Sequence, residues 1–452
     1  MDTISTALAD FIGNVRFERL PAPVIAQAKL RVLDLVGVAF AGYASMEFPR
    51  LVVNYFADLG GKPEATLLQT RAKIPALNAA FGNAVCAHAI DMDDGHRFAA
   101  LHPGTVVIPA ALAAAEITGA SGCEFLAGVV AGYEVMIRVG AAINPSSLKR
   151  GFHATGIAGS FGASAGAACI LRLSPAQTVN ALGLAGLQAG GLLQVNHELE
   201  GAKSKPINPG RAAASGLFSS ILAQRGAPGP LAIFEGEDGF LKAFADQVQI
   251  EVLTDGLGQT YAIENTYDKL YAACRHAHAC IDAALEAARS GQVDPHSIQR
   301  ITVETYAAGV RLAGIAHPPT PSAARFSIPF SVALALLKQD AGSDKYSETN
   351  VADAEIQALA DRVDLSVSEL WEGMYPNQRG ATVTLVDGQD RVWRAEVGLA
   401  KGEPENPASW EELYAKFLAN ATTLVSEPHA RHLGDVIRTL DSNTLQEFVA
   451  LI

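Results

Sequence analysis

One short segment combines histidines with carboxylates, and a further histidine follows it closely in the sequence. The segment from His88 to His96 holds three aspartates, and His102-Pro103-Gly104 follows it. Imidazoles and carboxylates bind divalent metals, but this spacing misses the calcium-loop pattern and lacks its terminal Glu. We therefore expect no metal. The alternative is an Asp-rich loop whose carboxylates accept backbone N–H groups and cap a helix that begins near Pro103.

Another candidate lies in Gly151-Phe152-His153-Ala154-Thr155-Gly156, where a histidine stands at the expected start of a helix. The positive end of the helix dipole favours the neutral imidazole, which accepts a proton near neutral pH. His153 is therefore a candidate general base. The alternative is a histidine with only a structural role at a junction between loop and helix.

Candidate cations come from Lys203-Ser204-Lys205-Pro206 and Tyr267-Asp268-Lys269-Leu270-Tyr271. Lysines are usually solvated, so neither segment means much by itself. Removing a proton from the carbon beside a carboxylate, however, creates a dianionic intermediate that needs fixed positive charges around it. Lys205 and Lys269, together with two histidines in one cleft, would meet that need.

Two other patterns resemble a hydrolase motif and a zinc site but lack the structural context that these require, and a nucleotide-binding motif is absent. Gly162-Ala163-Ser164-Ala165-Gly166 matches the hydrolase pattern G-x-S-x-G, but its surroundings are helical and lack the required preceding strand. The residues from Cys274 to Cys280 place four zinc-binding side chains at alternate positions, yet the segment runs into a helical pattern where alternate positions diverge. No Gly-rich nucleotide loop is present, so we expect no cofactor.

The elements that must hold these residues are mainly helical. From Pro23 to about Phe244, apolar residues recur at helical spacing in block after block. Small residues along a whole face of the segment 156–167 let backbones approach closely, which predicts a helix buried in a bundle. Asn208-Pro209 has the form of a capping residue before a helical proline and predicts the start of a helix that runs to Arg225.

The pattern changes at about Tyr267. Residues 298–306 alternate apolar and polar side chains, and segments 381–386 and 391–397 flank an Asp387-Gly388 turn, which predicts a hairpin. After a Pro-containing connector, helical periodicity returns. We therefore predict a mainly α fold, with a large all-helical domain built from both chain ends and a smaller α+β lid domain. The predicted boundaries are residues 1–266 and 401–452 for the helical domain and 267–400 for the lid.

Composition limits the class of protein. The 452 residues are 49% hydrophobic and 18% charged, which is typical of a globular protein with a large core. The net charge of -13 opposes attraction to nucleic acid or to anionic membranes. Five cysteines give no disulfide framework, and neither a signal sequence nor a membrane span is expected. We expect a cytoplasmic protein without nucleic-acid or membrane partners.

Taken together, five motifs in order resemble the MmgE/PrpD family. They are His88 to Asp94, His102-Pro103-Gly104, Gly151-Phe152-His153, Ser204-Lys205-Pro206, and Lys269-x-Tyr271-x-x-Cys274-x-x-x-His278-x-x-Ile281-Asp282-Ala283. The likeness covers nearly the whole chain. That family includes 2-methylcitrate dehydratase, cis-aconitate decarboxylase and iminodisuccinate epimerase. The resemblance implies two domains with the site between them, usually in a homodimer.

The resemblance also implies roles for individual residues. By motif position, the catalytic residues are His102, His153, Lys205, Lys269 and Asp91. The substrate-binding residues are Asp94, His96, Lys205, Lys269 and Tyr271. One of the two catalytic histidines would remove a proton, and the other, or a lysine, would protonate the leaving group or the opposite face. Asp91 would orient a histidine, and which histidine is the base stays open.

Two positions depart from the family pattern. Asp94-Gly95-His96 stands where several relatives have Asp-Asp-Thr, so His96 is a candidate to replace a hydroxyl. Phe330 stands where decarboxylase-like relatives carry a tyrosine, and phenylalanine cannot donate a proton. We expect a cofactor-independent lyase acting on a small di- or tricarboxylate, of the 2-methylcitrate dehydratase type. The alternatives are an epimerase of the iminodisuccinate type, then a decarboxylase or a non-catalytic binding subunit.

Overall fold

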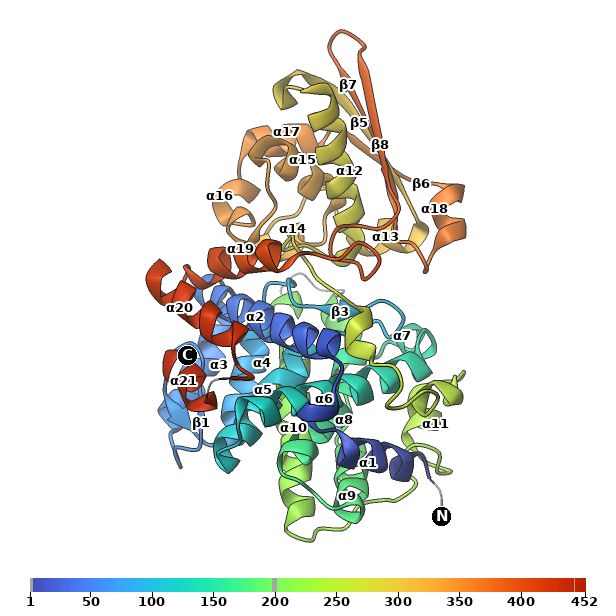
Figure 1. Ribbon diagram of the computed structural model, residues 1–452. Coiled ribbons are helices and arrows are strands. Elements are labelled where there is room, and N and C mark those ends of the chain that lie inside the picture. Colours follow the sequence, from blue (N-terminus) through green and yellow to red (C-terminus); the bar gives the residue numbers. More distant parts are fainter. Residues whose placement is uncertain (1–2, 197–200, 443) are drawn as a thin grey trace. The chain divides into compact units, whose positions relative to one another are not determined.

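The computed structural model describes residues 3–196, 201–442 and 444–452. It confirms the predicted mainly α fold (Figure 1). The chain divides into two compact units. The first unit comprises residues 1–89, 93–266 and 410–452, and the second unit comprises residues 90–92 and 267–409.

The first unit is a helical bundle that both chain ends build. Its helices are α1 (Ile4–Asn14), α2 (Ala22–Ser45), α3 (Glu47–Leu59), α4 (Ala76–His88), α5 (Gly104–Thr118), α6 (Gly122–Ile143), α7 (Ser146–Lys149), α8 (Ala154–Ile170), α9 (Pro175–Gly186), α10 (Ile207–Gln224), α11 (Phe240–Phe244), α19 (Trp410–Ala421), α20 (Glu427–Arg438) and α21 (Leu445–Leu451). Short strands β1 (Ala65–Thr66) and β2 (Lys73–Ile74) form an antiparallel pair, and β3 (Gly95–His96) lies between α4 and α5. These strands are too short to show an alternating pattern in the sequence.

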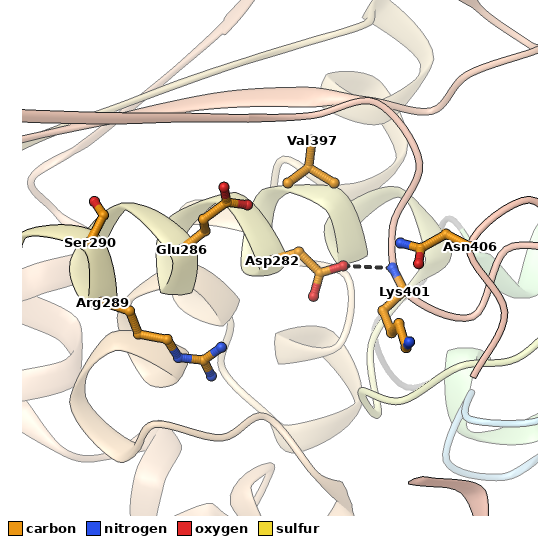
Figure 2. Close-up of a pocket in the computed structure, with 7 residues that line it drawn as sticks. All are labelled: Asp282, Glu286, Arg289, Ser290, Val397, Lys401 and Asn406. Atoms are coloured by element: carbon orange, nitrogen blue, oxygen red, sulfur yellow. Dashed lines mark hydrogen bonds between the residues drawn. The ribbon is translucent and has the colours of Figure 1, made fainter. Parts of the chain in front are cut away.

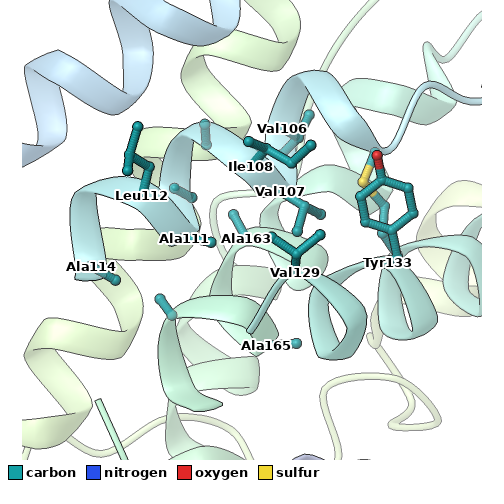
Figure 3. Packing of buried hydrophobic residues seen from close by; sticks show 14 of the residues in the cluster. Val106, Val107, Ile108, Ala111, Leu112, Ala114, Val129, Tyr133, Ala163 and Ala165 are labelled. Carbon is teal, nitrogen blue, oxygen red and sulfur yellow. The ribbon is translucent and has the colours of Figure 1, made fainter. Parts of the chain in front are cut away.

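Helix α8 lies in the middle of this bundle, as its small residues predicted, and packs against α5, α6 and α10 (Figure 3). The contact between α6 and α8 is close because glycines face each other. A Cβ atom on Gly132 would lie 2.8 Å from the carbonyl oxygen of Gly162, and one on Gly166 would lie 3.0 Å from that of Gly128. Only glycine allows two helix backbones to approach this far.

Helix α6 has the length and mean hydropathy of a membrane-spanning segment. Within the fold, however, 94% of its apolar window is buried. Among the residues that the structure describes, no other helix meets both criteria. Burial of this kind is typical of the central helix of a large core.

The second unit is an α+β fold around a four-stranded sheet of order β6-β5-β7-β8. Strand β5 (Ile298–Thr305) runs parallel to β6 (Val363–Val367) and antiparallel to β7 (Ala381–Asp387), which pairs with β8 (Val392–Val397) as the predicted hairpin. Strand β4 (Thr266–Tyr267) precedes the unit's helices, and α12 packs against β7 and β8. The helices are α12 (Arg275–Gly291), α13 (Ala307–Ala313), α14 (Pro321–Ala324), α15 (Ile328–Lys338), α16 (Glu348–Val351), α17 (Ala354–Ala360) and α18 (Glu369–Met374).

Candidate active site

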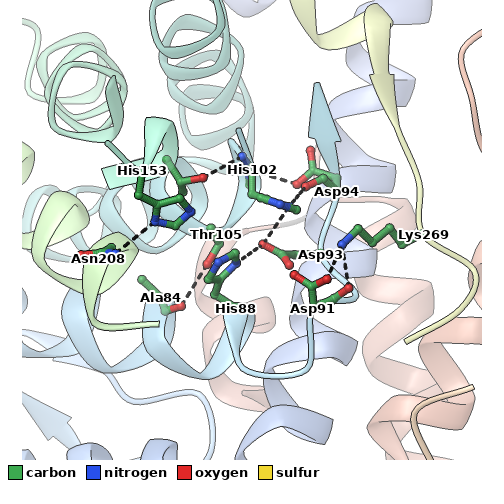
Figure 4. A network of polar contacts seen from close by, with 12 residues as sticks. Ala84, His88, Asp91, Asp93, Asp94, His102, Thr105, His153, Asn208 and Lys269 are labelled. Carbon is green, nitrogen blue, oxygen red and sulfur yellow. Dashed lines mark hydrogen bonds and ion pairs between the residues drawn. The ribbon is translucent and has the colours of Figure 1, made fainter. Parts of the chain in front are cut away.

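Three histidines of the first unit lie close together at the ends of helices (Figure 4). His88 is the last residue of α4, His102 lies just before α5, and His153 directly precedes α8. The ring centroid of His88 is 5.0 Å from that of His102 and 5.8 Å from that of His153. The fold thus brings the two histidines selected from the sequence next to a third one that was not selected.

Asp93 connects two of these rings. Its Oδ2 atom is 2.7 Å from Nδ1 of His88 and 3.5 Å from Nδ1 of His102. The side chains of Asp93 and His88 are fully buried. Because a carboxylate accepts hydrogen bonds, the neutral His88 ring carries its proton on Nδ1. Asp93 is also placed to stabilise positive charge on His102.

The tautomer of His102 is fixed by the main chain. Its Nδ1 atom is 2.8 Å from the carbonyl oxygen of Asp94, and its backbone N–H donates to Oγ1 of Thr155. A carbonyl oxygen can only accept, so Nδ1 donates the proton of the neutral ring. The lone pair of neutral His102 is therefore on Nε2, which makes this atom a proton acceptor.

Asp94 holds the start of α5. Its Oδ1 atom accepts the backbone N–H of Gly104 at 3.1 Å, and its Oδ2 atom accepts the hydroxyl of Tyr133 at 3.0 Å. An Asp-rich loop whose carboxylates accept backbone N–H groups at this helix start was one of the two interpretations of the sequence, and Asp94 makes such a contact. Burial raises the pKa of Asp94 to about 7; the charge of Arg31 opposes this shift and that of Asp93 adds to it.

Replacing Asp94 with asparagine is expected to flatten the pH dependence of stability. The pKa is raised from 3.8 when unfolded to about 7 in the fold, so the folded protein binds the extra proton. Stability from this group is therefore full below about pH 4 and is lost as the pH rises to about 7, by about 4 kcal/mol. An asparagine side chain at this position can still hydrogen-bond to Gly104 and Tyr133, but it carries no charge.

Urea unfolding of the helical signal by circular dichroism at pH 5, 6, 7 and 8 measures this effect. The variant should gain stability over the unmodified protein as the pH rises, and exposed Asp10 replaced with asparagine is the matched control. Parallel stability curves for the Asp94 variant and the unmodified protein would contradict a raised pKa.

Among the described residues, His88, Asp93 and His102 form a group that could hold a metal ion, with one ligand-type atom of each within 4.8 Å of the others. Two of these atoms, on His88 and Asp93, are hydrogen-bonded to each other at 2.7 Å. A metal would have to break that bond. We interpret the three side chains as a hydrogen-bonded group that sets the protonation of His102.

His153 is anchored from two sides. Its backbone N–H donates to the carbonyl of Gly191 at 3.1 Å, and its Nδ1 atom is 3.1 Å from Nδ2 of Asn208. Gly191 has a φ of +139°, which favours glycine, and a Cβ atom on Gly156 would lie 2.6 Å from the carbonyl oxygen of Gly190. The loop at 190–191 can therefore close over the start of α8 because residues 156 and 191 are glycines.

Asn208 does not cap α10 as predicted. The helix begins at Ile207, after Pro206. Asn208 is thus already inside the first turn, and its side chain turns to His153. Pro209 fits there because the first turn of a helix needs no backbone donor.

Two other predicted residues of the first unit lie near helix and strand ends. Lys205 is partly exposed, directly before Pro206, and its carbonyl accepts the backbone N–H of Asn208. His96 is buried in β3, where its Nδ1 atom accepts the backbone N–H of Ala99 at 3.1 Å. His96 therefore already takes part in a local turn, whereas Lys205 stands at the start of the helix that holds His153.

In the second unit, Lys269 binds Asp91. Its Nζ atom donates to the backbone carbonyl of Asp91 at 2.8 Å and to Oδ2 of the same residue at 3.0 Å. Asp91 has a φ of +52°, and Lys269 is only 1% exposed. Arg325 donates to the carbonyls of Ile90 and Ala272, and burial lowers its pKa to about 10. Two buried cations thus tie segment 90–92 to the second unit.

Tyr271 also has a partner within the second unit. Its hydroxyl donates to Oδ1 of Asp282 at 2.6 Å, and burial raises the pKa of the phenol. Asp282 lines a pocket of about 550 Å³ (Figure 2). The lining residues are Asp282, Glu286, Arg289, Ser290, Val397, Lys401 and Asn406. None of them belongs to the catalytic or substrate-binding set predicted from the sequence.

His88, Asp93 and Asn208 lie at the candidate site, although their sequence patterns do not predict them as site residues. His88 and Asp93 lay inside the motif but were weighed only as metal ligands or caps. The sequence Asn208-Pro209 predicted a helix-capping role for Asn208, and not a contact with His153. The roles predicted for Asp91, His102, His153, Lys205 and Lys269 stay predictions, while their positions are now defined.

The chain thus has a helical unit that contains clustered histidines and carboxylates, and a second unit with an α+β fold. This combination identifies the class of protein. The sequence model of the MmgE/PrpD N-terminal domain matches residues 6–253, and that of the C-terminal domain matches residues 271–442. The chain therefore belongs to the MmgE/PrpD family, as its motifs predicted.

The proteins similar to this chain include cis-aconitate decarboxylases, which are lyases. The chain is 30% identical to the cis-aconitate decarboxylase-like protein oryM of Aspergillus oryzae, over 66% of this chain and 66% of that protein. It is 25% identical to the cis-aconitate decarboxylase of Aspergillus terreus, over 98% of this chain and 94% of that protein. The human cis-aconitate decarboxylase is also 25% identical, over 98% of this chain and 92% of that protein.

Proposed function

We propose that the protein is a lyase that removes a proton from the carbon next to a carboxylate of a small di- or tricarboxylate. The observation that carries this proposal is the tautomer of His102. Its Nδ1 atom donates to the carbonyl of Asp94, so Nε2 of the neutral ring is a proton acceptor. The Asp93 carboxylate, 3.5 Å from Nδ1, favours the imidazolium that forms when the proton is taken.

In a hydro-lyase of the 2-methylcitrate dehydratase type, such a base both removes the proton from carbon and returns it to the leaving hydroxyl. His102 takes the proton from the carbon, and the electron pair of the broken C–H bond forms the double bond. The neighbouring C–O bond breaks, and the departing hydroxyl takes a proton from the imidazolium and leaves as water. One proton moves on and off His102, so the enzyme returns to its starting state.

Lys205 is the proposed anchor for a carboxylate of the substrate. It is partly exposed at the start of α10, where the helix dipole also favours an anion. The adjacent negative charge that develops during proton removal is stabilised by such a cation. No nucleotide or redox group takes part in this scheme.

Decarboxylation of a cis-aconitate-like acid is the second candidate. It is favoured by the names of the similar proteins, which are cis-aconitate decarboxylases. In that reaction the C–C bond to a carboxylate breaks, carbon dioxide leaves, and the carbon takes up a proton. It requires a proton donor and no base, whereas the hydrogen bond from Nδ1 makes Nε2 of a neutral His102 ring a proton acceptor, which favours the hydro-lyase.

Proton NMR in deuterated water tests the proposal. The chelator-treated protein is incubated with 2-methylcitrate, citrate, cis-aconitate and iminodisuccinate stereoisomers. Loss of water with deuterium exchange at the carbon beside a carboxylate supports the hydro-lyase, and the signals of a product that has lost one carboxylate support the decarboxylase. Exchange with inversion and no elimination would identify an epimerase. No exchange or product from any substrate would contradict the proposal, and loss of activity on chelation would point to a metal at His88, Asp93 and His102.

A further inference from the structure

We infer that Asn208 is a positioning residue that keeps His153 neutral with its proton on Nε2, so that His153 acts as a hydrogen-bond donor and not as a base. The inference rests on the proposed function, because the donor is assigned to the negative charge formed when His102 removes a proton. It separates the roles of two histidines that the sequence left interchangeable.

The orientation of the Asn208 amide follows from its two neighbours. Its Nδ2 atom is 3.1 Å from Nδ1 of His153 and 3.5 Å from the carbonyl oxygen of Leu192. A carbonyl oxygen can only accept, so the amide nitrogen faces both groups. The reversed amide would bring its own oxygen against the Leu192 carbonyl. Nδ1 of His153 is therefore an acceptor, and the proton of the neutral ring is on Nε2.

Both partners of this hydrogen bond are held by the main chain. Asn208 lies in the first turn of α10 and is 8% exposed. One turn further along α10, Arg211 donates to the carbonyls of Gly156 and Gly190, which belong to the start of α8 and to the loop against it. His153 is bonded to the neighbouring Gly191. Helix α10 thus fixes the imidazole and its surroundings together.

His102 has the opposite arrangement. Its Nδ1 atom donates to a carbonyl, whereas Nδ1 of His153 accepts from an amide. The two neutral rings therefore carry their protons on different nitrogen atoms. Neutral His102 has a lone pair at Nε2, whereas neutral His153 has an N–H at Nε2. Proton removal beside a carboxylate needs both, since the base creates an anion that a fixed neutral donor stabilises without giving up its proton.

A direct test is long-range proton–nitrogen NMR of the protein labelled with ¹⁵N-histidine. His153→Gln assigns the signals of this residue among the eleven histidines. The expected result for the unmodified protein at neutral pH is a neutral His153 ring with its proton on Nε2, and a His102 ring with its proton on Nδ1. A proton on Nδ1 of His153, or a doubly protonated ring, would overturn the inference.

Two variants of Asn208 connect the tautomer to the reaction. In Asn208→Asp the carboxylate accepts from Nδ1, so the proton moves there and Nε2 loses its donor function. In Asn208→Leu, of similar size, neither tautomer is imposed. Removing one donor to a developing anion costs about 10² to 10³ in rate. We expect Asn208→Asp to lower kcat about 10²-fold with little change in KM, and Asn208→Leu to lower it less.

Unchanged kcat in Asn208→Asp with the proton now on Nδ1 would contradict the role assigned to His153. The tautomer measurement needs no substrate, so it decides the inference even if a variant folds poorly. It also separates the two proposals. If no polycarboxylate is turned over, the proposed function fails, while the protonation of His153 in the unmodified protein still confirms or overturns the positioning by Asn208.

Discussion

Replacement of His102 with glutamine is expected to lower kcat about 10³-fold and to abolish deuterium exchange at the carbon beside the substrate carboxylate. General bases contribute about 10² to 10⁴ in rate. Glutamine is close to histidine in size, and the backbone N–H of residue 102 can still donate to Oγ1 of Thr155, so the loop before α5 keeps this anchor. The substitution removes the proton acceptor at Nε2 together with the hydrogen bond from Nδ1 to Asp94.

The comparison with His153→Gln sharpens this prediction. Glutamine retains an N–H that can point to an anion, so His153→Gln should retain measurable exchange, whereas His102→Gln should not. The control is His432→Gln, on the exposed side of α20. Exchange that persists in His102→Gln but disappears in His153→Gln would reverse the two roles and contradict the assignment of the base.

The general architecture was predictable because it depends on local patterns. Helical periodicity and small residues identify a buried α8, where Gly166 and Gly128 approach closely. The two segments that flank the Asp387-Gly388 turn identify the β7–β8 hairpin, whose turn is held by the Asp387 carboxylate accepting two backbone N–H groups. In each case the signal lies within a few residues of the element that it predicts.

The assignment of residues 90–92 to the second unit could not be predicted in this way. These residues follow α4 directly in the sequence, yet their backbone carbonyls accept hydrogen bonds from Arg325 and Lys269. No periodicity connects positions so far apart. Contacts of this kind depend on the complete fold, and a short segment offers no pattern of its own.

Only part of the candidate site could be predicted, because the rest depends on contacts between residues that are distant in the sequence. The family motifs identify His102 and His153, but their protonation depends on a carbonyl and an amide that are distant from each other in the sequence. Asn208 illustrates the limit. Its sequence neighbourhood has the form of a helix cap, and only the packing of α10 against the start of α8 shows that its amide is used on a histidine.

Replacement of Lys269 with methionine is expected to destabilise the second unit by about 3 to 5 kcal/mol, since removing one partner of a buried ion pair leaves a costly charge behind. Lys269 donates to both the backbone and the carboxylate of Asp91. It therefore also stabilises the left-handed backbone of Asp91, whose φ of +52° is unfavourable for this residue. The surface pair of Lys338 with Asp353 is the contrast, since Lys338→Met should cost less than about 1 kcal/mol.

Urea unfolding followed by tryptophan fluorescence measures the effect, because two of the three tryptophans, Trp371 and Trp393, lie in the second unit. Asp91→Asn combined with Lys269→Met removes both charges and should recover part of the stability, so a double-mutant cycle gives the coupling. A substrate-binding lysine would behave differently. If Lys269→Met unfolds at the same urea concentration as the unmodified protein while KM rises, the ammonium group serves the substrate and its bond to Asp91 contributes little to the fold.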